Sequence, residues 1–211
     1  MKYESTAQEV RRAYRQTARA EATEATGERI LDAFSEQLRD GWFDEIRLED
    51  VAKAAGVSVQ TVIRRFGGKE GLLEAAQAQL DHVIRSTRAI PAGDIASAVK
   101  VLLADYEHTG DLLIRILAQE ARQAPLKTLT DAGRAGHRGW LRDVVAPWLD
   151  ALSSAEAERR LDAVVAVTDV YVWKLLRRDM GRPVAQLEAL MLQLIPAALA
   201  GDGPPQIGEL R

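Results

Sequence analysis

The segment from residue 48 to residue 73 constrains the fold most, because its pattern is that of two short helices joined by a tight turn. Apolar residues recur there at helical spacing, so helices over 48–55 and 59–66 can pack their apolar faces together. Gly56 stands where a left-handed backbone conformation would end the first helix, and Ser58 can cap the second by accepting from an exposed backbone amide. The segment therefore predicts a helix-turn-helix.

The outer face of the second helix is predicted to be positively charged. Val62 and Phe66 lie inward at i and i+4, which leaves the residues around them to face outward. Between residues 59 and 69 the chain has three cations and no acid, whereas residues 23–80 as a whole carry seven basic and eleven acidic side chains. The three cations are Arg64, Arg65 and Lys69. We expect this face to enter a DNA major groove.

Contacts with the phosphate backbone are expected on both sides of this helix. Lys69 would begin the next helix, where its ammonium and the unpaired backbone amides can receive a phosphate, and Gly67 and Gly68 would let the backbone approach. The first residues, 1–22, are predicted to form a flexible basic arm that either contacts DNA or is simply solvated. Its cations include Arg11, Arg12, Arg15 and Arg19.

Two stretches of the sequence resemble a known family: GERILDAF at residues 27–34 and LEDVAKAAGVSVQTVIRRFGGKEGLL at residues 48–73. They look like the DNA-binding head of the tetracycline-repressor (TetR) family of bacterial regulators. The initiating helix, the G-V-S turn, the T-x-x-x-x-F spacing and the K-E-x-L-L motif are specific in combination. The resemblance implies an N-terminal three-helix DNA-binding head and a C-terminal helical bundle that binds a ligand and dimerises.

Carried over by position, the resemblance implies that Val59, Gln60 and Arg64 lie towards base edges, while Thr61 and Lys69 hold the phosphate backbone. Two departures stand out. The family usually has an aromatic residue at the position of Ile63, which can touch a thymine methyl group but cannot hydrogen-bond a phosphate. Arg47 replaces a usual Thr or Ser cap, which puts that cap in question and offers a phosphate contact instead. The predicted DNA-binding residues are Arg47, Ser58, Val59, Gln60, Thr61, Ile63, Arg64, Arg65 and Lys69.

Helical periodicity dominates the whole chain, and no convincing strand alternation occurs, which predicts an all-α fold of about nine helices. Gly and Pro residues mark the ends of these helices. The predicted helices cover residues 26–40, 48–55, 59–66, 69–89, 94–108, 111–122, 126–151, 154–179 and 183–200. The predicted domains are the basic arm at 1–22, a DNA-binding domain at 23–80, a ligand-binding and dimerisation domain at 81–200, and a flexible tail at 201–211.

The C-terminal domain is expected to enclose a ligand cavity, because the family has one between its central helices. Polar and aromatic side chains on otherwise apolar helices are the candidates for its lining. Asp169 is the strongest of them, since valines surround a carboxylate that needs a partner, whereas Glu120 can equally pair with Arg115 or Arg122. The candidate ligand-binding residues are Tyr106, Arg115, Glu120, His137, Trp140, Asp169 and Trp173.

The last two predicted helices have apolar faces wider than one stripe, which suggests a partner. The family places its dimer interface in these helices as a four-helix bundle. The predicted interface residues are Leu187, Leu190, Met191 and Leu194. The expected partners are therefore double-stranded operator DNA, a small-molecule effector and a second copy of the chain.

Other classes of protein are disfavoured by what the sequence lacks. The absence of cysteine excludes disulfides and thiolate metal sites, and three isolated histidines build no evident metal site, so neither metal nor cofactor is expected. Enzyme motifs such as H-E-x-x-H and G-x-S-x-G are absent, and a charged N-terminus suits a cytoplasmic protein without a membrane span. The predicted function is a ligand-responsive regulator, released from its operator by a small molecule. The alternative is a helical partner-binding scaffold that has lost DNA binding.

Overall fold

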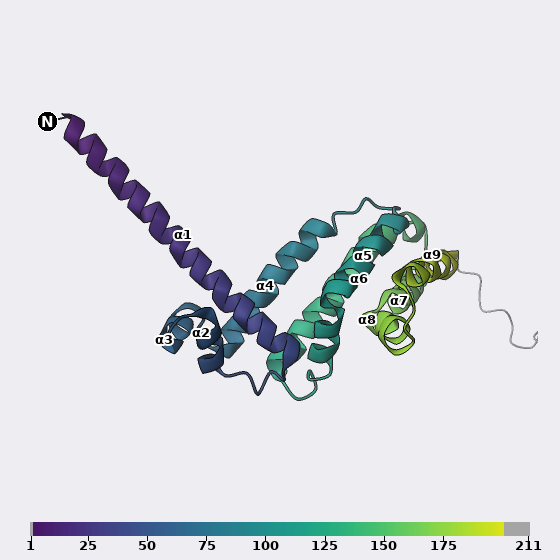
Figure 1. Ribbon diagram of the computed structural model, residues 1–211. Helices are drawn as coiled ribbons and strands as arrows, with labels where there is room; N and C mark the ends of the chain where they lie inside the picture. The colour runs from purple at the N-terminus through teal and green to yellow at the C-terminus, as the bar shows by residue number, and fades with distance from the viewer. Residues whose placement is uncertain (1, 201–211) are drawn as a thin grey trace, which may run out of the picture. The chain divides into compact units, whose positions relative to one another are not determined.

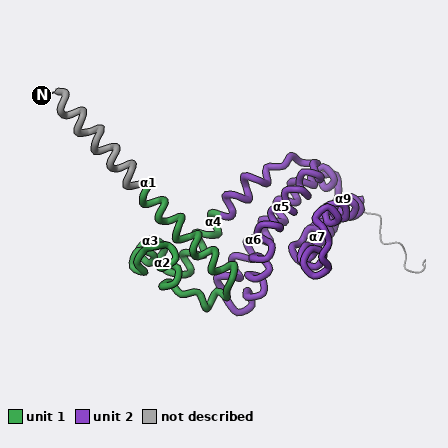
Figure 2. Tube along the Cα trace, in the orientation of Figure 1, with its two compact units in different colours: residues 1–79 green, residues 80–211 purple. Residues whose placement is uncertain are grey.

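The computed structural model describes residues 2–200 and the side chains of residues 21–200. Every regular element in this part of the chain is a helix (Figure 1), which confirms the predicted all-α fold. The chain divides into two compact units, residues 1–79 and residues 80–211 (Figure 2). The expected tail at 201–211 and the side chains of the expected basic arm up to residue 20 lie outside the described residues.

Unit 1 is a small helical head. It contains α1 (Lys2–Asp40), α2 (Leu48–Ala55), α3 (Val59–Phe66) and the first part of α4 (Lys69–Thr87). Five side chains of its core are completely buried: Ile30, Phe34, Val51, Val62 and Leu72. The expected start of the first helix at residue 26 was wrong, because α1 begins at Lys2; no Gly or Pro interrupts that stretch of the sequence.

The turn between α2 and α3 has the predicted geometry. Gly56 adopts a left-handed conformation with φ of 68°, and the amides of Gly56 and Val57 donate to the carbonyls of Lys53 and Ala52. Ser58 Oγ accepts from the Thr61 amide at 3.2 Å and so caps α3. These two local devices end one helix and start the next, and the bounds of α2 and α3 agree with those predicted from the sequence.

Unit 2 is a larger helical bundle. Its elements after α4 are α5 (Ile95–Leu117), α6 (Ala124–Leu149), α7 (Ser154–Thr168), α8 (Val170–Trp173), the π-helix η1 (Lys174–Asp179) and α9 (Val184–Ala200). One apolar core joins α5, α6, α7 and α9. The division between the units falls inside α4, so this helix belongs to both.

The two helices predicted at 94–108 and 111–122 are one continuous helix, α5. Gly110 was expected to interrupt it, but this glycine has another role. A Cβ atom at Gly110 would lie 2.5 Å from Cη2 and Cζ3 of Trp173, whose side chain is completely buried. Gly110 therefore leaves room for the indole on the surface of α5 instead of ending the helix.

The single helix predicted at 154–179 is broken at Asp169. Asp169 has extended backbone angles, φ −68° and ψ 147°, and its Oδ1 accepts from the Tyr171 amide at 2.8 Å. The carbonyl of Thr168 accepts a hydrogen bond from the Tyr106 hydroxyl at 3.0 Å. A side chain from α5 thus satisfies a backbone group that the break removes from the helical pattern.

Candidate functional site

The outward face of α3 carries exposed side chains of the kinds that contact DNA bases. Gln60, Ile63 and Arg64 are exposed, while Val62 between them is completely buried. The first turn of α3 contains no acid, and its last turn contains Arg64 and Arg65. Within the described part of the chain, Arg64 forms no ion pair or hydrogen bond, so its guanidinium is available to a ligand. This face can present donors and an apolar surface to a groove.

Arg65, unlike Arg64, has a hydrogen-bond partner within unit 1, although both residues were predicted to bind DNA. Its Nη1 donates to the carbonyl of Thr23 on α1 at 2.8 Å. Its guanidinium also lies over Gly27, where a Cβ atom would overlap it. Arg65 therefore fixes α3 against α1, and a role in DNA binding stays a prediction for it.

The ammonium of Lys69 is also occupied within unit 1. Nζ donates to the carbonyls of Phe43, Asp44 and Ile46 at 2.8, 3.3 and 3.3 Å, and it lies 4.8 Å from the centre of the Phe43 ring. All three ammonium donors thus bind the loop between α1 and α2. The expected phosphate contact of Lys69 stays a prediction, and no local pattern in the sequence could have revealed these carbonyl partners.

Ser58 and Thr61 form a local pair at the start of α3. Their hydroxyl oxygens lie 2.9 Å apart, in addition to the cap bond from the Thr61 amide. Val59 is half-buried beside them. Arg47 occupies the position before α2 with extended backbone angles and makes no side-chain cap bond, so α2 starts without one. Its exposed guanidinium lies at the start of the helix-turn-helix.

Comparison with known proteins identifies this head. Residues 30–76 match the family described as bacterial regulatory proteins, tetR family. This head is similar to the DNA-binding domain of the TetR family. It is 28% identical over 147 residues to the HTH-type transcriptional regulator AlkX of Mycobacterium tuberculosis (strain ATCC 25618 / H37Rv), over 66% of this chain and 64% of AlkX. The matched region thus spans less than two thirds of the length of that relative.

Solved structures extend the likeness over most of the chain. A transcriptional regulator from Rhodococcus sp. Rha1 matches with a TM-score of 0.64 and 21% identity, covering 85% of this chain and 99% of that one. A TetR-family regulator from Rhodococcus sp. matches with a TM-score of 0.63 and 17% identity, covering 82% and 98%. At these identities the likeness concerns the fold alone.

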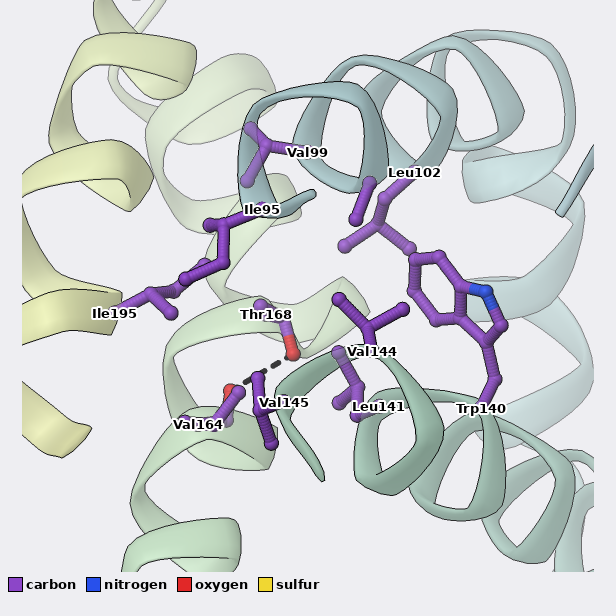
Figure 3. A pocket seen from close by; sticks show the side chains of 11 residues that line it. Ile95, Val99, Leu102, Trp140, Leu141, Val144, Val145, Val164, Thr168 and Ile195 are labelled. Atoms are coloured by element: carbon purple, nitrogen blue, oxygen red, sulfur yellow. Dashed lines mark hydrogen bonds between the residues drawn. The ribbon is translucent and has the colours of Figure 1, made fainter. Parts of the chain in front are cut away.

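The bundle of unit 2 contains a small cavity between its helices (Figure 3). Its volume is about 10 Å³, which is roughly the space of one water-sized sphere. Of the seven candidate ligand-binding residues, only Trp140 lines it. The other lining residues are Ile95, Ala98, Val99, Leu102, Leu141, Val144, Val145, Val164, Thr168 and Ile195.

Two further candidates reach the edge of this cavity through Thr168. The Tyr106 hydroxyl donates to its carbonyl, and His137 Nε2 lies 3.2 Å from its hydroxyl oxygen. Burial raises the pKa of Tyr106, while burial and the nearby Arg88 charge together lower the pKa of His137 to about 4. His137 is therefore a neutral imidazole at neutral pH.

The remaining candidates have partners outside the cavity lining. Trp173 donates to Glu107 at 2.8 Å, and Asp169 caps α8. Glu120 binds Arg134 and the Thr130 hydroxyl, where the sequence offered Arg115 or Arg122 as partners. The hydrogen bonds from Arg134 and Thr130 lower the pKa of Glu120. Arg115 lies half-buried on α5. A role for these four residues in ligand binding stays a prediction.

The predicted interface residues on α9 divide into two pairs. Leu187 and Met191 are each only 1% exposed, because they pack into the core of their own chain. Leu190 is half-buried and Leu194 is exposed. Three other apolar residues in the same C-terminal part, which are not among the predicted interface residues, are about half exposed: Tyr171, Leu175 and Met180. In the described residues, no helix is long and apolar enough to cross a membrane.

Proposed function

We propose that this protein is a DNA-binding transcriptional regulator that reads an operator with the outward face of α3. The single observation that carries the proposal is this exposed, acid-free face with an unpaired Arg64. Gly56 and Ser58 fix the turn that presents α3, and Arg65 ties α3 to α1. A recognition helix must be held rigidly by its supporting helices if it is to select among base pairs.

We further propose that the regulator works as a homodimer in which two heads contact two half-sites. Exposed apolar side chains on the C-terminal helices support this assignment, since an isolated chain would expose them to water. In chain order, these side chains are Tyr171 on α8, Leu175 on η1, Met180 directly after η1, and Leu194 on α9.

Regulation by a small molecule is part of the same proposal. The bundle has a cavity whose position between α5, α6 and α7 suits an effector, and the protein would leave its operator when the effector binds. The direction of this response is inferred from the family. An effector that raises operator affinity would reverse it.

The DNA proposal is tested by selecting duplexes from a random pool with the full-length protein and measuring their binding by fluorescence anisotropy. Arg64→Ala is expected to weaken binding to the selected duplex about 5-fold to 100-fold, because one side-chain contact with a base edge is lost. Arg39→Ala is the matched control, since it removes an exposed arginine at the end of α1, outside α2 and α3. If no duplex is enriched, the scaffold alternative replaces the regulator.

The dimer proposal predicts that a double substitution, Leu175→Glu and Leu194→Glu, converts the dimer to a monomer. Two buried carboxylates without partners would each oppose association. Light scattering coupled to size-exclusion chromatography reports the mass directly. Val83→Glu, which places a carboxylate at an equally exposed apolar position on α4, is expected to leave the dimer intact. A wild-type protein that is monomeric at micromolar concentration contradicts the proposal.

A further inference from the structure

An open groove on unit 1 carries a tryptophan that no neighbour covers. The groove has a volume of about 410 Å³, and the Trp42 side chain in it is 47% exposed. Three carboxylates, those of Glu36, Asp40 and Glu45, line the groove beside this indole. The other lining residues are Ala33, Gln37, Gly41, Ile46 and Ala54. An indole face next to carboxylates suits a guanidinium or ammonium group.

The loop that carries Trp42 is held in place from the inside of unit 1. Phe43 and Ile46 on either side are buried, and the Lys69 ammonium binds the carbonyls of this loop. The Glu45 amide donates to the Trp42 carbonyl at 3.0 Å, which closes a turn between these two lining residues. The groove is therefore formed in advance, and a partner that enters it orders little of the backbone.

The groove continues an acidic stripe along α1. Five exposed carboxylates recur every four residues on this helix, and those of Asp32 and Glu36 form no ion pair or hydrogen bond in the part of the chain that the structure describes. The acidic stripe consists of Glu24, Glu28, Asp32, Glu36 and Asp40. Like charges four residues apart are neighbours on a helix and destabilise it. A cationic partner along the stripe would remove this repulsion.

The same chain contains a basic segment with the same spacing. Residues 2–20 have five cations and two acids, and Arg11, Arg15 and Arg19 recur every four residues. α1 is one helix from Lys2 to Asp40 (Figure 1), so Arg15 and Glu36 are about 31 Å apart along its axis. A chain therefore cannot place its own basic segment on its own stripe, whereas a second copy can.

An antiparallel pair of α1 helices matches the two charge patterns. The arginines of one copy then lie opposite acids of the other: Arg11 opposite Asp40, Arg15 opposite Glu36, and Arg19 opposite Asp32. Such a pair has twofold symmetry, so each copy gives its basic segment and receives that of the other. Arg11 faces the end of the stripe, where the groove offers the indole of Trp42.

We propose that two copies of this chain associate through their α1 helices, the basic segment of each lying on the acidic stripe and groove of the other. This contact involves neither the outward face of α3 nor the exposed apolar side chains of the C-terminal helices. It therefore goes beyond the proposed function, and it gives residues 2–20 a protein partner where the sequence offered DNA or solvent.

Disulfide cross-linking of the full-length protein tests the contact, because the chain has no cysteine of its own. Arg15→Cys with Glu36→Cys replaces one facing pair and keeps the other two. Under mild oxidation at about 50 mM salt, these positions of different copies are expected to join about fivefold faster, or more, than in the control. The control is Arg15→Cys with Glu74→Cys, whose second position is exposed on α4. Peptide mass spectrometry identifies the bond, and equal rates overturn the proposal.

Charge reversal in the cross-linking variant shows whether opposite charges hold the helices together. Asp32→Arg with Asp40→Arg is expected to slow cross-linking about fivefold, and adding Arg11→Glu with Arg19→Glu is expected to restore it. Raising the salt to about 0.5 M is expected to slow it severalfold, since the pairs are exposed. Melting curves verify that each variant folds. A rate that ignores the charges, or a reversed pair that does not recover, overturns the proposal.

The outcome is independent of the regulator and of the C-terminal dimer. Cross-linking is measured without DNA, so its failure leaves operator selection standing, and a failure to select a duplex leaves the cross-link standing. Exposed ion pairs alone are too weak to hold a dimer at micromolar concentration and physiological salt. Light scattering of the Leu175→Glu and Leu194→Glu variant therefore still reports the C-terminal contact alone.

Discussion

Trp173→Ala is expected to lower the free energy of unfolding by about 3–5 kcal/mol, the range for truncating a fully buried aromatic side chain. The indole has no exposed surface, lies flush against Gly110, and packs at 6.0 Å between ring centres against Tyr106. Its N–H binds Glu107, and the Arg178 guanidinium lies 4.5 Å from the centre of its ring. Urea denaturation followed by circular dichroism measures the loss.

Trp148→Ala is the matched control for this prediction. It removes the same side chain from a position that is 39% exposed, near the end of α6, and well under half the loss is expected. Equal losses in the two variants would mean that Trp173 does not hold the bundle together as its contacts indicate.

Gly71→Ala is expected to abolish selective binding to the selected duplex and to destabilise unit 1 by about 1–3 kcal/mol. A Cβ atom at Gly71 would overlap the carbonyl oxygen of Phe66, the last residue of α3. This neighbour is backbone, so it can yield only if α3 moves relative to α4. Thermal unfolding and anisotropy together measure the two effects.

Gly27→Ala is the matched control for Gly71→Ala, because it also adds one Cβ atom to a crowded glycine of unit 1. The three atoms nearest to its added Cβ all belong to the guanidinium of Arg65, the far end of a flexible side chain that can move aside. We expect a smaller loss of stability and a smaller loss of DNA binding than in Gly71→Ala, because the contact displaced is a side-chain hydrogen bond, from Arg65 to Thr23, and not backbone. If the two variants behaved alike, the close approach of α4 to the end of α3 would not be what positions the recognition helix.

The bounds of α2 and α3 could be predicted to the residue because their ends are determined locally. Gly56 ends α2 through its own left-handed conformation, and Ser58 starts α3 with its own hydroxyl. In the bundle, by contrast, the structural role of a residue depends on a partner that is distant in the sequence. Gly110 accommodates Trp173 and does not end α5, and the break after Thr168 depends on the Tyr106 hydroxyl.

In the candidate sites, too, some features could be predicted from the local sequence and others depend on residues distant in the sequence. The exposed positions of Gln60, Ile63 and Arg64 follow from helical periodicity alone. The partners of Arg65 and Lys69 do not, because the carbonyls that bind them come from α1 and the loop after it. The residues that line the cavity could not be predicted either, because packing among four helices, α5, α6, α7 and α9, decides which side chains reach it.

The hydrogen bonds that Arg65 and Lys69 form within unit 1 affect how strongly DNA binding should depend on salt. Each cation that neutralises a phosphate releases counterions, and the logarithm of affinity falls by about 0.9 per contact for each tenfold rise in salt. Two of the three cations between residues 59 and 69 already bind carbonyls in their own unit. The α3 region alone should therefore release few counterions, so its discrimination between sequences would persist when general electrostatic attraction is screened.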